Sequence, residues 1–142
     1  MGQAREAMDR LTEAMTTTRS AGAIAECFAP DAVASTPDGE FRGRDAIADY
    51  MAGFAVAVPD SEFDHEHRYE AGDTAVDEGW LHGTNTGPLT MPDGTTLAPT
   101  GRPIRIHGCD IATAEDGRIV DYRLYFDQLA FLEQLGLAPA AG

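Results

Sequence analysis

The chain has 142 residues and a formal net charge of −14, with 24 acidic side chains and 10 basic ones. A surface of this charge repels nucleic acid and anionic membrane surfaces, so we expect neither as a partner. All 10 basic residues are arginine, which excludes a Schiff base to lysine. Carbon–carbon chemistry would therefore have to use acid–base catalysis on an enol or enolate.

The length and a hydrophobic content of 43% predict one domain over residues 1–142, with a frayed tail at 137–142. No segment has the pattern of a signal peptide or the ~20 apolar residues of a membrane span, so a soluble cytoplasmic protein is expected. Cys27 and Cys109 form no Cys-x-x-Cys pattern, which favours two buried, reduced thiols.

Helices are predicted for most of the first half of the chain. Apolar residues at spacings of three and four predict a helix over 3–18. A second, short helix is predicted over 20–29, stopped by Pro30. A short strand at 31–36 and a third helix over 43–58 follow.

Strands are predicted for most of the second half. Alternating side chains predict strands at 61–70 and 74–84, and the Gly- and Pro-rich segment 87–101 predicts a loop or a wide hairpin. A short C-terminal helix is predicted over 128–135. Helices followed by mostly antiparallel strands indicate an α+β fold, with one curved sheet and helices packed on one face.

The last third of the chain predicts a long β-hairpin. Two strands, 102–114 and 118–126, are joined by a Glu-Asp-Gly turn at 115–117, and Asp-Gly between alternating apolar segments favours a tight hairpin. Asp110 then shares a strand face with small or apolar side chains. These are Ile104, Ile106, Gly108 and Ala112. A carboxyl group in such surroundings needs an explanation.

Several short motifs are arranged in an order typical of one family. They are Phe-Arg-Gly-Arg-Asp-Ala-Ile at 41–47, Val-Pro-Asp at 58–60, Gly-Thr-Asn-Thr-Gly at 83–87, Pro-Thr-Gly-Arg at 99–102, Asp-Gly-Arg-Ile at 116–119, and Asp127 followed by Gln-Leu-Gly at 134–136. Over 20–136 this pattern resembles the SnoaL-like polyketide cyclases of the NTF2-like superfamily. The resemblance implies a cone-shaped, curved, mostly antiparallel sheet, N-terminal helices that enclose an apolar pocket, and a homodimer.

The same resemblance implies a reaction. The best-known members close a ring of a polyketide keto ester by intramolecular aldol condensation, without metal or cofactor. Their acid–base aspartate corresponds to Leu124 here, and their assisting histidine corresponds to Asp110. Asp110 also corresponds to the carboxylic acid that stabilises the oxyanion in ketosteroid isomerases. The general base of those isomerases would fall near Ser35 or Thr36.

Asp110 and His82 are the predicted catalytic residues. Desolvation should raise the pKa of Asp110, so that it donates a hydrogen bond to an enolate or removes a carbon-bound proton. Glu78, Trp80 and His82 share one strand face, and if that face lines the pocket, His82 meets Asp110 across it. The structural alternatives are an aspartate bonded to a neighbouring tyrosine or backbone group, and an ordinary strand histidine.

Other residues are expected to shape the substrate pocket or to support it. The predicted substrate-binding residues are Tyr50, Phe54, Glu78, Trp80, Tyr122, Leu124 and Phe126. Asp127 precedes the last helix, which favours a capping role over a catalytic one. His65 and His67 share a predicted strand face, but without a third ligand we expect no metal. His107 lies opposite Asp110 in the alternation and is expected at the outer surface or in the dimer interface.

These observations predict a cofactor-independent enzyme, most simply a polyketide cyclase, which acts by enolate chemistry on a small hydrophobic, polyketide-like substrate. One alternative is a non-catalytic ligand-binding or accessory module, favoured by Leu124 at the cyclase aspartate position. Another is an isomerase, dehydratase or hydrolase on the same fold.

Overall fold

The structure is a computed structural model that describes residues 2–91 and 93–137. Residues 138–142 of the expected frayed tail lie outside this range. The elements, in chain order, are α1 (Gln3–Glu13), the π-helical turn η1 (Ala14–Thr18), α2 (Ala21–Glu26), β1 (Phe28–Thr36), β2 (Gly39–Arg42), α3 (Arg44–Ala57), β3 (Glu62–Ala71), β4 (Thr74–Thr84), β5 (Leu89–Thr90), β6 (Thr96–Leu97), β7 (Pro103–Glu115), β8 (Arg118–Phe126) and α4 (Gln128–Gln134).

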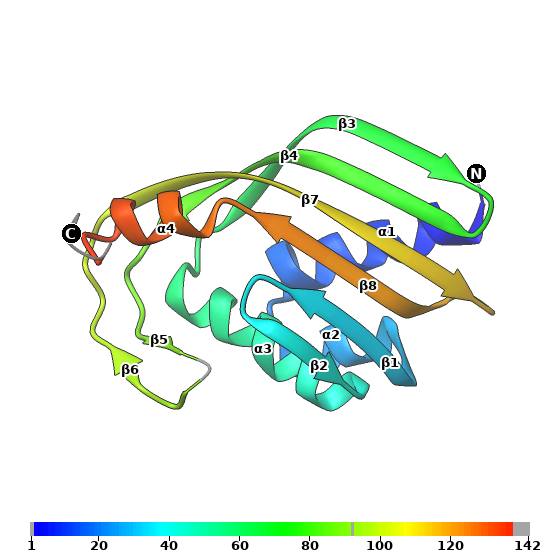
Figure 1. The fold of residues 1–142 in the computed structure, drawn as a ribbon, viewed down its shortest axis with the longest axis horizontal. Coiled ribbons are helices and arrows are strands. Elements are labelled where there is room, and N and C mark those ends of the chain that lie inside the picture. The colour runs from blue at the N-terminus through cyan, green and yellow to red at the C-terminus, as the bar shows by residue number, and fades with distance from the viewer. Residues whose placement is uncertain (1, 92, 138–142) are drawn as a thin grey trace.

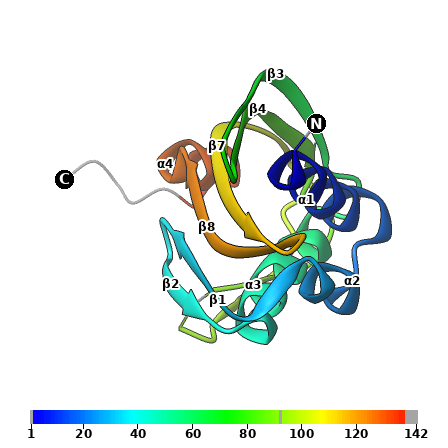
Figure 2. The same ribbon diagram turned by 90° about the vertical axis from the view of Figure 1, so that its right-hand side faces the viewer.

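One six-stranded sheet, in the order β2-β1-β8-β7-β4-β3, forms the body of the fold (Figure 1). All neighbouring strands in it are antiparallel except β1 and β8, which run parallel. Seen end-on, the sheet curves strongly, and α1, α2 and α3 lie on its concave side (Figure 2). The predicted α+β class and the mostly antiparallel curved sheet are confirmed.

The predicted hairpin is formed by β7 and β8. Its turn contains Asp116 with φ of 52° and Gly117 with φ of 80°. Two successive positive φ values are the feature of the hairpin turns that match the twist of the strands, and Asp-Gly tolerates them. The turn places Asp110 opposite Leu124 and Ala112 opposite Tyr122, so the predicted shared face of Asp110 and Ala112 is confirmed, and Tyr122 and Leu124 continue that face on β8.

The N-terminal helices are confirmed, with two differences. The first helix ends at Thr18 as predicted, but its last turn is the π-helical turn η1, and Arg19 with φ of 57° follows it. The second helix is shorter than predicted, because β1 already begins at Phe28. Pro30 therefore lies within a strand rather than stopping a helix, and the added residues give β1 one further pair with β8, Phe28 opposite Ile119.

A β-bulge interrupts β3 between His65 and His67. His65 pairs with Gly79, whereas His67 pairs with Glu78, so Glu66 is an extra residue on the β3 side. The strict alternation predicted for 61–70 is therefore wrong beyond His65.

The segment 87–101, predicted to be a loop or a wide hairpin, contains the short hairpin of β5 and β6.

The core divides into two clusters. The larger one packs α1, α2 and α3 against β1, β7 and β8, and includes Met8, Ile24 and Phe28. The smaller one, around Val58 and Phe131, closes the end of the fold where α4 lies. Cys27 is buried as expected, but Cys109 is only half-buried, and neither forms a disulfide. None of the helices within the described residues is long and apolar enough to cross a membrane.

Candidate active site

A cavity of about 170 Å³ lies between the sheet and the helices, and its walls are mostly apolar. Tyr50, Phe54, Tyr122, Leu124 and Phe126, all predicted as substrate-binding residues, line this cavity. Further apolar side chains come from elements far apart in the sequence. These include Met15, Met51, Phe63, Leu81, Ile106 and Phe131.

Asp110 lies on the cavity wall, hydrogen-bonded to a single side chain. The Tyr122 hydroxyl donates to its Oδ2 at 2.6 Å, while its Oδ1 is buried without a partner. Burial raises the pKa of Asp110 to about 7; the hydrogen bond from Tyr122 lowers it in part, and the nearby charge of Asp77 raises it further. The carboxyl group can therefore take up or release a proton near neutral pH.

Asp77 faces the same cavity from the neighbouring strand. It is directly opposite Asp110 in the β4–β7 pairing and is 1% exposed. The guanidinium group of Arg5 donates to its Oδ1 at 2.6 Å, and Arg68 reaches the same oxygen at 3.4 Å. A buried carboxylate is tolerated only when it is paired, and Arg5 provides that partner from α1.

Arg5 is held by the backbone of the sheet as well as by Asp77. Its Nη2 donates to the carbonyl oxygens of Tyr69 at 2.9 Å and Val76 at 3.3 Å. The side chain is only 8% exposed. Arg5 therefore links α1 to β3 and β4, and its positive charge is paired with the Asp77 carboxylate.

His65 completes a band of polar groups across the sheet. Its Nε2 lies 3.4 Å from Asp77 Oδ2, and its ring packs edge-on against Phe63. The band runs from His65 on β3 to Asp77 on β4, Asp110 on β7 and Tyr122 on β8, and all four residues line the cavity. An imidazole beside a carboxylate is an arrangement that can orient a general base.

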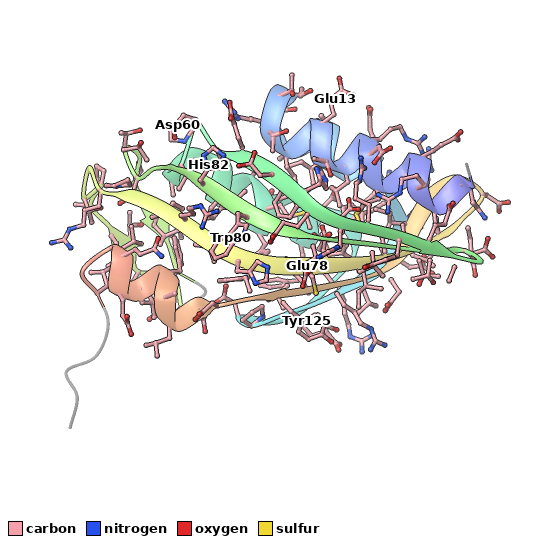
Figure 3. The ribbon with its side chains drawn as sticks, turned by 90° about the horizontal axis from the view of Figure 1, so that it is seen from above. Glu13, Asp60, Glu78, Trp80, His82 and Tyr125 are labelled. Atoms are coloured by element: carbon pink, nitrogen blue, oxygen red, sulfur yellow. The ribbon has the colours of Figure 1, made fainter. Side chains whose placement is uncertain are left out.

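The structure corrects the predicted role of the face that carries His82. Glu78, Trp80 and His82 lie on the outer face of β4, away from the cavity (Figure 3). His82 Nε2 is 3.1 Å from Asp64 Oδ2, so its charged neighbour is on β3 rather than at Asp110. His82 and Asp110 therefore do not meet, and none of the three outer residues can contact a ligand in the cavity.

The outer positions have their own partners. The Arg105 guanidinium carbon lies 3.8 Å from the centre of the Trp80 ring, and the ring of His107 packs against Trp80 at 4.6 Å. His107 thus lies on the outer face, opposite Asp110, as predicted.

His67 also lies on the outer face, because the bulge has moved it there, and it is 3.7 Å from Glu78. Because His65 and His67 do not share a face, they cannot form the metal pair that was considered.

Asp127 is a helix cap. Its side chain accepts a hydrogen bond from the backbone N–H of Ala130 at 3.0 Å, and it does not line the cavity. The capping role predicted for it is confirmed. Within 2–91 and 93–137, no group of three His, Cys, Asp or Glu side chains is arranged to hold a metal ion.

A second polar group, missed in the sequence, lines the cavity at the β1–β2 turn. Asp38 Oδ2 accepts a hydrogen bond from the Tyr50 hydroxyl at 2.6 Å, and its Oδ1 accepts one from Gln128 at 2.6 Å. Burial, and to a lesser degree Asp38, raises the pKa of Tyr50. The carboxylate thus comes from the turn, beyond the positions Ser35 and Thr36 at which a base was sought.

The inner face of β4 was also missed, although the sequence contains a signal for it. Alternation separates the two faces of 74–84 without saying which one is inside. The face with Ala75, Asp77, Gly79 and Leu81 has the smaller side chains, which suit a concave surface close to helix α1. The prediction that His82 meets Asp110 instead required the face with Glu78, Trp80 and His82 to line the pocket.

Together, the curved sheet, the helices on its concave side and the apolar cavity with isolated carboxyl groups define an NTF2-like α+β protein. The sequence profile of the SnoaL-like domain matches residues 8–122, and the chain belongs to this family. No curated protein matches the sequence.

Solved structures with the same fold cover nearly the whole chain. A proposed SnoaL-like polyketide cyclase from Jannaschia sp. CCS1 is 20% identical, with a TM-score of 0.80 over 96% of this chain and 94% of that one. IdmH, a proposed polyketide cyclase from Streptomyces antibioticus, is 23% identical, with a TM-score of 0.75 over 95% and 99%. A ketosteroid isomerase-like protein from Catenulispora acidiphila, in complex with trimethylamine, is 21% identical, with a TM-score of 0.73 over 96% of both chains. At these identities the likeness concerns the fold.

Proposed function

We propose that this protein is a cofactor-independent acid–base enzyme that forms the enolate of an apolar carbonyl compound, as a polyketide cyclase does. The observation that carries the proposal is the Asp110 carboxyl group, which lies in an apolar cavity and has a pKa raised to about 7. A protonated carboxyl group in such a place can donate a hydrogen bond to a developing enolate oxygen.

His65 and Asp110 divide the work in this proposal. Asp110, held by Tyr122, donates a hydrogen bond to the substrate carbonyl, and His65, beside Asp77, removes the proton from the adjacent carbon. The enolate carbon then attacks a second carbonyl carbon of the same molecule. A carbon–carbon bond forms, the carbonyl π bond breaks, and the new alkoxide takes the proton from His65, which restores both residues.

The positions of the carboxyl groups support a cyclase with a rearranged site. Leu124 occupies the position that the family resemblance assigns to the cyclase aspartate, and Asp110 is its direct cross-strand partner. The acid thus comes from the opposite residue on the neighbouring strand and reaches the same cavity. Leu124 at the cyclase aspartate position had favoured a non-catalytic accessory module. In the proposed enzyme, Asp110 supplies the carboxyl group that Leu124 lacks.

The size of the cavity limits what can be bound. A cavity of 150 Å³ lined by apolar side chains is known to hold benzene, so about 170 Å³ accommodates a single ring. We infer that one ring of the substrate enters the cavity and that the remainder of a larger polyketide-like substrate extends through its opening.

Asp38 favours a second candidate function, a ketosteroid isomerase-like proton shift. It is a second carboxyl group on the same cavity, held by Tyr50 and Gln128. A carboxylate that moves a proton between two carbons, with Asp110 hydrogen-bonded to the carbonyl oxygen, would isomerise an unsaturated ketone. Loss of isomerase activity in Asp38→Asn, with cyclase activity absent from the wild type, would favour this second function.

The test is product analysis with the purified protein and a panel of keto esters of one to three rings. Conversion is expected for the wild type, and Asp110→Asn should lower turnover at least ~10²-fold, as loss of a general acid does. His107→Gln, on the outer face, is the matched control and should retain full turnover. Equal turnover of Asp110→Asn and wild type would refute the assignment of Asp110.

A further inference from the structure

Three unpaired polar atoms lie together on the cavity wall. Among the described residues, four buried side-chain nitrogen or oxygen atoms have no hydrogen-bond partner, and three of them are His65 Nε2, Asp77 Oδ2 and Asp110 Oδ1. Buried polar atoms in folded proteins are nearly always satisfied. Their concentration at one place therefore needs an explanation.

The three atoms are close enough to contact one small group. His65 Nε2 and Asp77 Oδ2 are 3.4 Å apart. Asp77 and Asp110 are directly opposite residues of neighbouring strands, and the Cβ atoms of such pairs lie about 4.5–5.5 Å apart. Each carboxylate is anchored through its other oxygen, Asp77 by Arg5 and Asp110 by Tyr122. Arg5 and Tyr122 thus hold the two carboxyl groups in place and leave Asp77 Oδ2 and Asp110 Oδ1 free to contact a ligand.

The chemistry of the three atoms selects the ligand. Asp77 Oδ2 needs a donor, a protonated Asp110 can donate, and His65 Nε2 can donate or accept according to its tautomer. A hydroxyl group supplies one donor and two acceptor lone pairs, and so matches both needs. A carbonyl oxygen accepts only and would leave Asp77 Oδ2 unpaired. An anion would face the Asp77 carboxylate, and the nearby Arg5 is already engaged with that carboxylate and with two backbone carbonyls.

We infer that His65, Asp77 and Asp110 form a subsite for a hydroxyl group carried by a ring compound in the cavity. The catalytic meaning of this inference rests on the proposed function. Aldol addition converts the attacked carbonyl into a hydroxyl that takes its proton from His65, and the subsite would hold this hydroxyl after the enolate has reverted to a carbonyl and left Asp110. The bound species would then be a β-hydroxy carbonyl compound. The binding preference itself can be measured without any turnover.

The experiment compares two probes of the size of one ring, benzyl alcohol and toluene, by ligand-observed NMR titration of the purified protein. A wholly apolar cavity would favour toluene, because burying an unpaired hydroxyl costs free energy. The subsite predicts that the wild type binds benzyl alcohol at least as tightly as toluene. His65→Phe should shift the ratio of the two dissociation constants by ~10-fold or more towards toluene, with toluene binding retained.

The controls separate the subsite from other effects. His107→Phe makes the same substitution on the outer face and should leave the ratio unchanged, and His65→Gln, which keeps a polar group, should have an intermediate ratio. A wild type that prefers toluene, or that binds neither probe, overturns the inference. A wild type that prefers benzyl alcohol but converts no keto ester supports the subsite and contradicts the proposed function.

Discussion

Asp77 on β4 and Asp110 on β7 are direct cross-strand partners, and both carboxyl groups line the same cavity. Their surroundings differ in one respect. Asp77 forms a buried ion pair with Arg5, whereas Asp110 has only the hydroxyl of Tyr122. The guanidinium group of Arg5 thus compensates the Asp77 carboxyl group, while burial without a cation raises the pKa of Asp110 and makes it the proton donor of the pair.

Asp110 should make the stability of the protein fall as pH rises. Its pKa is about 7 in the folded protein against an ordinary value of 3.8, so the folded state binds the proton more tightly. The stabilisation is complete below about pH 4 and is lost as pH rises to about 7. At about 1.4 kcal/mol per pKa unit, the loss amounts to roughly 4 kcal/mol. Urea unfolding of wild type and Asp110→Asn between pH 4 and 8 measures it, and parallel curves would contradict the prediction.

Tyr122→Phe should raise the pKa of Asp110 above about 7. The hydroxyl of Tyr122 donates to the carboxyl group and lowers its pKa in the wild type, and phenylalanine removes the donor while filling the same buried space. A ¹³C NMR titration of the Asp110 carboxyl carbon measures the change. A titration midpoint that stays in place or falls would mean that this hydrogen bond does not stabilise the carboxylate.

Arg5→Leu should destabilise the protein by about 3–5 kcal/mol, because the buried Asp77 carboxylate loses its 2.6 Å partner and keeps only the longer, half-exposed contact with Arg68. Replacing both residues, as Arg5→Leu with Asp77→Leu, should recover most of that loss, since the uncompensated charge is then gone. Urea unfolding of the single and double variants measures both effects. A double variant as unstable as Arg5→Leu alone would show that the backbone contacts of Arg5 outweigh its pairing with Asp77.

His65 and His82 should respond differently to the same substitution. His65→Gln removes the base beside Asp77 and should lower turnover at least ~10²-fold. His82→Gln changes only the outer face, where His82 lies beside Asp64, and should leave turnover unchanged. Initial rates with any converted keto ester decide between them, and the reverse result would restore the outer face as the catalytic one.

Asp127→Ala should cost about 1 kcal/mol of stability without changing turnover. The side chain caps α4 through the N–H of Ala130 and does not line the cavity. Asp127→Asn keeps an oxygen that can accept this hydrogen bond and should retain most of the stability. Thermal unfolding measures the difference, and a loss of turnover at unchanged stability would assign Asp127 to catalysis instead.

Local patterns in the sequence were sufficient for much of the fold. The Asp-Gly turn, the faces of β7 and β8 around Asp110, and the cap at Asp127 depend on neighbouring residues, and all three agree with the structure. The parallel pairing of β1 with β8 depends instead on contacts between distant segments, which local periodicity does not contain.

The candidate site was predictable only in part, for two physical reasons. Alternation in a strand defines two faces but not the direction of the core, so the prediction for β4 depended on the assumption that the Trp80 face lines the pocket. The ion pair of Arg5 with Asp77 joins residues 72 positions apart, and nothing in the surrounding sequence of either one indicates the other.

The bulge in β3 has a consequence for how such a site can change in evolution. Phe63 and His65 alternate regularly and both line the cavity, and the extra residue, Glu66, places His67 on the outer face and Arg68 opposite Asp77. Deleting Glu66 would remove the bulge and leave His67 directly after His65, still on the outer face. If Glu66 were kept in a strand without the bulge, strict alternation would turn His67 inward and Arg68 outward. One inserted residue therefore decides whether this strand presents a second imidazole to the cavity or a second guanidinium group to Asp77, so an insertion can change the polar groups of the site with no substitution in it.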